Sequence, residues 1–403
     1  MRIRHKAKHL FLFVLCVVLM CLQTGCWSKD EIEDQSIYVG VGLDPASESK
    51  LEKQFRTEGG DYRKRKIMTS TLQIINVQSD SKNGGGQEAS TSQKPYYNIS
   101  ETGDSMFQLI REFSTRMERP VIGHHLKVIV INEKLARKYR MNELLDFFLR
   151  DNDIRPSSHV LISKGSARST MVAKDNKVIP SLRLMGLFDN RYRSLSILEP
   201  MTLSKLAGKM HGEQSYLLQN VIAADGEVKF SGSSIIKGKT QRLQGTLNEE
   251  ETIGSVWIMG TGQGGLVKSY NEDRQPLVYE VKGMKSKITS KVAGDDISFH
   301  VRIESNGRLI EEFANTNETI DSAFRKQVEE ATEKEVGRLT SLALKKVQKK
   351  YGIDVLGFGK QFSIQHPHKW EEIKDRWEEI FPEIPITVSI DMRITEYGAK
   401  NTR

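Results

Sequence analysis

The feature that most constrains this chain is a short apolar run at its start, followed almost at once by a cysteine. Arg or Lys stands at positions 2, 4, 6 and 8, and an unbroken apolar run extends from Leu10 to Leu22. This basic-then-apolar order is typical of an export signal. The run has thirteen residues, whereas a helix that crosses a bilayer core of about 30 Å needs about twenty. The sequence therefore predicts that the rest of the chain is exported and that the run itself is a targeting signal.

The residues after the run distinguish a lipoprotein signal from an ordinary secretory signal. Small Thr24 and Gly25 stand directly before Cys26, the arrangement in which a thiol is alkylated by diacylglycerol and the chain is cut just ahead of it. We expect a signal peptide over residues 1–25 and a mature chain that begins at lipidated Cys26 and is held on a membrane by its acyl chains. Gln23 stands where a branched aliphatic residue is usual, so an uncleaved signal anchor is the alternative.

Cysteines and charge limit what the exported body can do. The cysteines are confined to the signal and its end, at Cys16, Cys21 and Cys26. The body therefore has no thiol for a disulfide, a zinc–thiolate site or a cysteine nucleophile. The formal charge of the whole chain is +8. Four positive charges lie in the signal, at Arg2, Arg4, Lys6 and Lys8, so the exported body carries about +4. This small excess does not indicate nucleic-acid binding and is compatible with an anionic membrane surface.

The first half of the body alternates between strand and helix patterns. Continuous apolar runs predict strands over residues 37–44, 66–77, 126–131 and 160–163. Apolar residues at helical spacing predict helices from Ser105 and over residues 141–150. The Ser- and Gly-rich stretch 78–94 predicts a surface loop, and 179–200 a connector. This alternation indicates helices packed on a sheet, in a mixed α/β domain over residues 26–200.

The second half shows closely spaced glycines and then one long helical pattern. The glycines predict turns of a mainly antiparallel sheet over residues 228–309, in a middle domain over 201–310 that begins with a short helix at 203–210. Apolar residues at three- and four-residue steps predict a long amphipathic helix from Thr319 to Tyr351, stopped by Gly352. A short helix and a half-buried strand over 386–394 complete a C-terminal domain over 311–403. The expected fold class is α+β, with three mixed α/β domains and largely antiparallel sheets.

Two glycine-rich motifs look like nucleotide-binding sequences but fail on context. Gly260 to Gly265 fits G-x-G-x-x-G, yet no helical pattern follows to receive a pyrophosphate, so a turn between strands is expected. The stretch from Gly238 to Thr240 resembles the end of a phosphate loop. The glycine required five residues before Gly238 is replaced by Ser233. We therefore expect no nucleotide cofactor.

The remaining candidates for chemistry also favour structural roles. His124 and His125 are adjacent, and neighbouring side chains in a strand point to opposite faces, so the two could not easily share a metal. His366 and His368 lack an accompanying Glu-x-x-His helix. No Gly-x-Ser-x-Gly or Ser-x-x-Lys nucleophile motif is present. Trp370 and Trp377 are seven residues apart on one helical face, which favours core packing. We expect no metal site and no enzyme activity.

Four blocks of the sequence, in order, resemble one known family. The first is Gly25-Cys26-Trp27 with the charged stretch 28–34 and the strand that contains Gly40 and Gly42. The second runs through His125-Leu126-Lys127 to Leu145-Asp146-x-x-x-Arg150-Asp151-x-x-Ile154-Arg155. The third is Asp225-Gly226, Gly232, Gly245 and Glu251-Thr252-x-Gly254-x-x-Trp257. The fourth is Asp354-x-x-Gly357-Phe358-Gly359 with Pro367-x-x-Trp370 and Trp377. Together they resemble the C subunit of the GerA-type spore germinant receptors, the Ger(x)C lipoprotein family; Gln23, and Ser28 in place of the usual Asp, depart from its pattern.

The resemblance implies three mixed α/β domains and a diacylglyceryl anchor at Cys26, on the outer face of the spore inner membrane. It implies two multi-pass partners, the A and B subunits of the same receptor, one of them similar to amino-acid transporters. Together they would sense the nutrients that trigger germination. It implies no enzyme activity, no cofactor and no nucleic-acid partner.

Two other classes of protein stay open at this point. A solute-binding lipoprotein of a membrane transporter would usually have two doubly wound lobes, and the glycine-rich sheet pattern after Asn220 argues against it. A cell-envelope hydrolase would need a nucleophile motif that we do not find. The sequence favours a non-catalytic receptor subunit that acts through protein–protein contacts.

Overall fold

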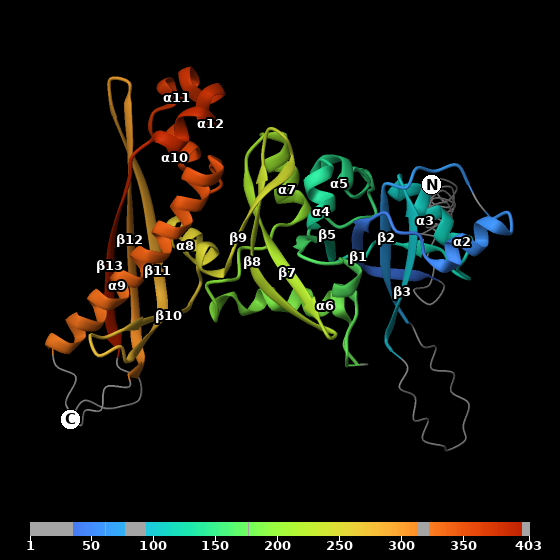
Figure 1. The fold of residues 1–403 in the computed structure, drawn as a ribbon, viewed down its shortest axis with the longest axis horizontal. Helices are drawn as coiled ribbons and strands as arrows, with labels where there is room; N and C mark the ends of the chain where they lie inside the picture. The colour runs from blue at the N-terminus through green and yellow to red at the C-terminus, as the bar shows by residue number, and fades with distance from the viewer. Residues whose placement is uncertain (1–34, 61, 77–93, 176, 313–321, 397–403) are drawn as a thin grey trace, which may run out of the picture.

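The protein is elongated and contains two β-sheets that lie one after the other along its long axis (Figure 1). The computed structural model describes residues 35–60, 62–76, 94–175, 177–312 and 322–396. The first sheet is built from strands between Ser36 and Leu247, and the second from strands between Gly265 and Glu396. Within these ranges no helix is both long enough and apolar enough to cross a bilayer.

The first sheet has nine strands in the order β3-β2-β1-β5-β6-β7-β8-β9, with β4 paired to β1. The strands are β1 (Ser36–Pro45), β2 (Met68–Ile75), β3 (Tyr96–Gly103), β4 (Val121–Ile122), β5 (Val128–Asn132), β6 (His159–Ser163), β7 (Tyr216–Ala224), β8 (Glu227–Lys237) and β9 (Arg242–Leu247). The central strands β1, β5, β6 and β7 are parallel, and the strands on either side pair antiparallel. Parallel strands are buried on both faces, which explains the unbroken apolar sequence of β5.

Helices cover both faces of this sheet. They are α2 (Lys50–Thr57), α3 (Met106–Ser114), α4 (Glu133–Lys138), α5 (Met141–Arg150), α6 (Pro180–Asp189) and α7 (Leu203–His211), with short 3-10 turns at Arg168–Met171 and Asn190–Tyr192. In β5, Ile129 and Ile131 join the core that contains α3, α5 and α7. Val128 and Val130 point the other way, into a smaller core with α6. The alternation of side chains along a strand therefore places α3 and α5 on the same face.

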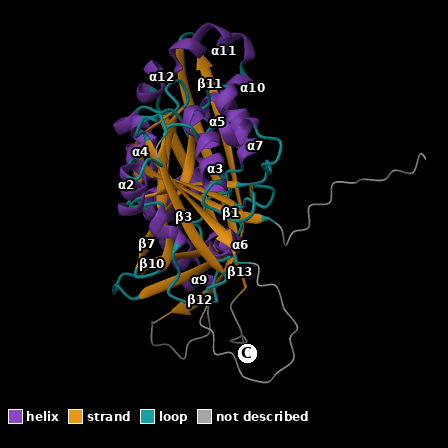
Figure 2. Ribbon diagram, turned by 90° about the vertical axis from the view of Figure 1, so that its right-hand side faces the viewer, coloured by secondary structure: helices purple, strands orange, loops and turns teal. Residues whose placement is uncertain are grey.

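The second sheet consists of β10 (Gly265–Tyr270), β11 (Pro276–Ala293), β12 (Asp296–Glu312) and β13 (Ile386–Glu396). The first three strands pair antiparallel, and β13 joins β12 in parallel. One core joins this sheet to its helices: α8 (Glu249–Met259), α9 (Ser322–Leu344), the π-helical continuation Lys345–Tyr351, α10 (Phe358–Gln365), α11 (Pro367–Ile373) and α12 (Trp377–Ile380), with 3-10 turns at Lys374–Arg376 and Phe381–Glu383. Viewed along the long axis, strands fill the middle of the molecule and helices flank them (Figure 2).

The expected α+β class and the long helix are confirmed. The helix is described from Ser322, continues through its π-helical part to Tyr351, and ends at Gly352, whose φ of 64° is the left-handed conformation typical of a helix stop. The predicted start at Thr319 and all but the last residue of the loop predicted over 78–94 lie outside the described residues. The predicted helix over residues 141–150 has the same bounds as α5, because its apolar positions and buried face coincide.

Two expectations about local structure are wrong. The stretch 228–309 is not one sheet, because β8 and β9 pair with β7 in the first sheet, whereas β10 to β12 belong to the second. Helix α8 separates the two groups. The stretch 179–200 contains helix α6 and is not only a connector. The division into domains over 26–200, 201–310 and 311–403 stays a prediction; β6 and β7, on either side of position 200, are hydrogen-bonded neighbours.

Candidate protein-interaction groove

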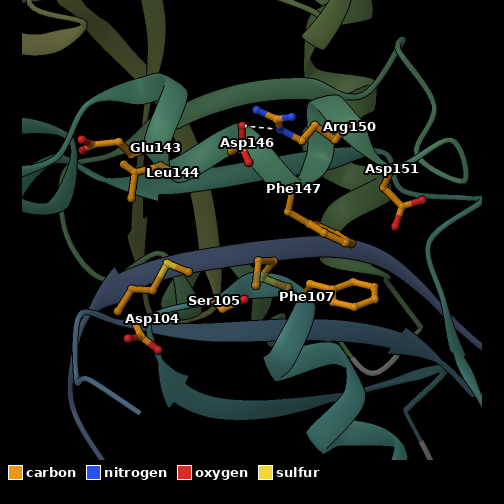
Figure 3. Close-up of a pocket in the computed structure, with 11 residues that line it drawn as sticks. Asp104, Ser105, Phe107, Glu143, Leu144, Asp146, Phe147, Arg150 and Asp151 are labelled. Atoms are coloured by element: carbon orange, nitrogen blue, oxygen red, sulfur yellow. Dashed lines mark hydrogen bonds and ion pairs between the residues drawn. The ribbon is translucent and has the colours of Figure 1, made fainter.

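A groove lies between α3 and α5, the two helices that share a core on one face of the first sheet (Figure 3). Its volume is about 430 Å³. Met106 and Leu144 belong to its lining and are themselves buried in the core beneath it. The groove therefore has a rigid base, since the side chains that form it are fixed by packing on the sheet.

Two phenylalanines, one from each helix, supply the apolar part of the groove. The buried positions of α3 recur at helical spacing and leave Phe107 off the core face, where it is 52% exposed. Phe147 of α5 lies across from it, with the two ring centroids 6.1 Å apart and the ring planes inclined by 39° (Figure 3). Phe147 also meets buried Phe148 edge to face at 5.2 Å. The pair thus offers aromatic surface that is held in place from below.

Carboxylates stand at both ends of the ring pair. Asp104 and Glu143 lie toward one end and Asp151 toward the other (Figure 3). Each accepts a hydrogen bond from a backbone N–H, at 3.2, 2.9 and 2.8 Å respectively. In the described part of the chain none of these three has a cationic side-chain partner within ion-pair distance. The fourth carboxylate, that of Asp146, is paired with Arg150 at 2.7 Å.

This arrangement favours binding over catalysis. Phe107 is exposed and Phe147 is partly buried, and together they can remove an apolar side chain from water. Aromatic ring faces also attract cations, as the Arg111 guanidinium 4.8 Å from the Phe107 ring centroid shows. Unpaired carboxylates next to such a surface add attraction for lysine or arginine. Over the described ranges, no group of three or more His, Cys, Asp and Glu side chains is placed to hold a metal ion.

The predicted lipidation site and the glycine-rich motifs noted in the sequence are not among the described residues that line this groove. Cys26, the predicted lipidation site, lies outside the described residues. Gly260 ends α8 with φ at 65° and leads into β10, so its glycine-rich stretch is a turn from helix to strand, where a turn between two strands was expected. Gly238 to Thr240 form the turn between β8 and β9. Neither stretch begins a helix, as a pyrophosphate site requires.

The histidines are dispersed. His124 lies 3.2 Å from the Asp153 carboxylate at the surface. Burial, together with nearby Arg155 and Lys127, lowers the pKa of His125. His366 packs against Phe362, with ring centroids 5.1 Å apart.

The Asp354 motif fixes the start of α10 through hydrogen bonds. The Asp354 carboxylate accepts backbone N–H groups from positions 356 to 359 at 2.6 to 3.2 Å, and the indole N–H of Trp377 at 3.2 Å. Gly357 has φ at 92°, a conformation that favours glycine. A Cβ at Gly359 would lie 2.8 Å from the Trp377 indole nitrogen. Trp377 also meets Trp370 edge to face at 5.3 Å. The motif therefore holds a helix start against an aromatic core.

Known families account for nearly all of the chain. A family model described as the N-terminal domain of spore germination proteins matches residues 28–222. A second, described as the C-terminal part of spore germination B3/GerAC-like proteins, matches residues 231–398. The chain belongs to the Ger(x)C family.

Individual relatives match this chain over nearly their full length. Spore germination protein YndF of Bacillus subtilis (strain 168) is 43% identical to this chain over 97% of each sequence. Spore germination protein B3 of the same organism is 26% identical, over 96% of this chain and 97% of its own length. The crystal structure of the GerBC protein superposes with a TM-score of 0.61 at 25% identity, covering 88% of this chain and 97% of the other.

Of the four sequence blocks that resemble the Ger(x)C family, the third lies in a packed core and the second contributes side chains to the groove. The third block packs α8 tightly: a Cβ at Gly254 would lie 2.0 Å from the Leu339 carbonyl oxygen of α9, and Trp257 is fully buried. The second block differs, because Asp146 and Asp151 line the groove while its apolar residues are buried. A family block thus supplies part of the groove surface.

Sequence reasoning did not find the groove. A local signal was present, since Phe107 lies outside the apolar stripe of its own predicted helix. That signal alone does not place Phe107 next to Phe147, which is forty residues away along the chain. The contact depends on how α3 and α5 pack on the sheet.

Proposed function

We propose that this Ger(x)C protein is a non-catalytic lipoprotein subunit of a nutrient germinant receptor in the spore inner membrane, and that nutrient-triggered germination needs it. The observation that carries the proposal is the match of both family models, one over residues 28–222 and the other over 231–398. The relatives that match over nearly their full length carry the name of spore germination proteins. No function outside germination is needed to account for the chain.

The membrane anchor is the diacylglyceryl group that we place on Cys26. Cys26 stands ten positions before Ser36, where β1 begins. An extended chain covers at most about 3.4 Å per residue, so in this proposal Ser36, the first residue of β1, lies within about 34 Å of the anchored cysteine. Two acyl chains give stable attachment where one is marginal.

The partners in this proposal are the multi-pass A and B subunits of the same receptor. The present subunit would act through contacts with their external surfaces. The groove between α3 and α5 is suited to this role, because it joins a partly exposed aromatic pair to charged side chains.

The proposal is tested by purifying this chain, tagged after Arg403, from detergent-solubilised spore membranes. We expect two multi-pass membrane proteins to be recovered with it and to be identified by mass spectrometry. Recovery of the chain alone, or with a transporter ATPase, would contradict the receptor proposal and support the solute-binding lipoprotein.

A further inference from the structure

We infer that the groove between α3 and α5 receives a segment of a partner receptor subunit in which an apolar side chain is flanked by lysine or arginine. The inference rests on the proposed function, since it takes the partner to be a membrane subunit of the receptor. It goes further by naming the contact surface on this chain and the chemistry of the segment that fits it.

The apolar half of the inference comes from Phe107 and Phe147. The Arg111 guanidinium lies over the Phe107 ring, 4.8 Å from its centroid, yet Phe107 is still 52% exposed, so part of the ring stays in contact with water unless a partner covers it. The two rings lie 6.1 Å apart on separate helices, and both helices are fixed to the same core. Aromatic anchors of this kind, pre-positioned and surrounded by polar groups, carry much of the binding energy at protein interfaces. The complementary group is a large apolar side chain that covers the ring pair.

The charged half comes from Asp104, Glu143 and Asp151. Their carboxylates accept only backbone N–H groups within the described chain. The nearby guanidinium of Arg150 is already held by Asp146 at 2.7 Å and does not neutralise them. A surface with this excess of negative charge favours a cationic partner and disfavours an acidic one. Carboxylates at both ends of the ring pair place the cations on both sides of the apolar anchor.

The shape of the groove favours a protein segment over a nutrient molecule. Sites for small molecules bury about 70–90% of the ligand surface. Here one of the two aromatic walls is itself half exposed, so the groove is open along its side. A segment that lies across the groove can cover Phe107 and Phe147 together, whereas a small solute would remain largely in water.

The test uses two sets of substitutions in the tagged full chain, purified from spore membranes. The first set, Phe107→Ala with Phe147→Ala, removes the aromatic pair. The second, Asp104→Asn with Glu143→Gln and Asp151→Asn, removes three charges but keeps a carbonyl acceptor at each position for the backbone N–H. Matched controls are Ile364→Ala, at a side chain that is 64% exposed on α10, and Glu272→Gln with Asp273→Asn in an exposed turn.

We expect each groove set to reduce the recovered multi-pass protein by about tenfold per tagged chain, and each control to leave it unchanged. Raising the salt concentration should weaken recovery by the wild-type chain more than recovery by the second set, in which the three carboxylates are replaced by amides. The protein that carries the second set should unfold at the wild-type temperature. The test therefore stays valid even where the first set, which removes the aromatic pair, lowers stability.

Wild-type recovery of the multi-pass proteins by both groove sets would overturn the inference while leaving the receptor proposal intact. If the same spores had also lost the nutrient response, the groove would be assigned to a small molecule. Failure of the wild-type chain itself to recover any multi-pass protein would instead contradict the proposed function.

Discussion

Replacing Trp377 with alanine is expected to lower the free energy of unfolding by about 3–5 kcal/mol, the range for a large aromatic side chain removed from a core. Trp377 is 7% exposed and its ring stacks on Phe362 at 6.0 Å. It also meets Phe299 and Phe381 at 6.2 and 5.8 Å. Alanine would leave a cavity among these rings and remove the indole N–H that binds Asp354 at 3.2 Å.

The measurement is urea unfolding followed by far-ultraviolet circular dichroism, on the chain from Trp27 onward, which keeps every described residue. Ile364→Ala is the matched control, because Ile364 is 64% exposed on neighbouring α10 and should change the stability by less than about 0.5 kcal/mol. A Trp377→Ala variant as stable as the control would show that the ring does not belong to the core, and would indicate an interface role.

Replacing Cys26 with alanine is expected to move the protein from the membrane fraction to the soluble fraction and to abolish the nutrient response. Each methylene of an acyl chain contributes about 0.8 kcal/mol to membrane binding, so removal of the acceptor thiol removes most of the attachment. No helix of the described residues could replace it as a span. The measurement is fractionation of spore lysates with immunodetection, together with germination of the same spores.

Cys21→Ala is the matched control, since Cys21 lies in the same apolar run but not at the predicted cleavage point. It should leave both fractionation and germination unchanged. Mass spectrometry of the mature N-terminal peptide should show a diacylglyceryl cysteine in the wild-type chain. An intact N-terminus at Met1 in the membrane fraction, or normal germination of Cys26→Ala spores, would contradict the lipid anchor.

Elements with a strong local pattern could be predicted from the sequence. Helix α5 follows from apolar residues at helical spacing, and the long helix follows from the same pattern with Gly352 as its stop. The strand β5 follows from an unbroken apolar run. In each case the signal lies within one element, where the spacing of side chains decides which face is buried.

Helix α8 was missed because its pattern is that of a largely buried segment. Seven of its residues are buried, which removes the polar face that marks an amphipathic helix. Val256, Trp257 and Ile258 read equally well as a strand. A start signal was nevertheless present, since Asn248 and Glu251 form a capping box at 2.8 Å.

The sheet to which a strand belongs could not be predicted. Glycine turns after Asn220 correctly indicated strands, but β8 and β9 reach the first sheet through β7 and its contact with β6. That pairing joins residues far apart in sequence and leaves no local pattern. The groove was missed for the same reason, because it exists only once α3 and α5 are packed side by side on that sheet.

The claim that this Ger(x)C protein serves a nutrient receptor is tested most directly by deleting its gene in the sporulating host and measuring germination nutrient by nutrient. The account predicts that the spores lose the response to one nutrient or nutrient mixture, that growth stays normal, and that the intact gene restores the response. Unchanged responses to every nutrient together with a defect in growth or solute uptake would contradict it.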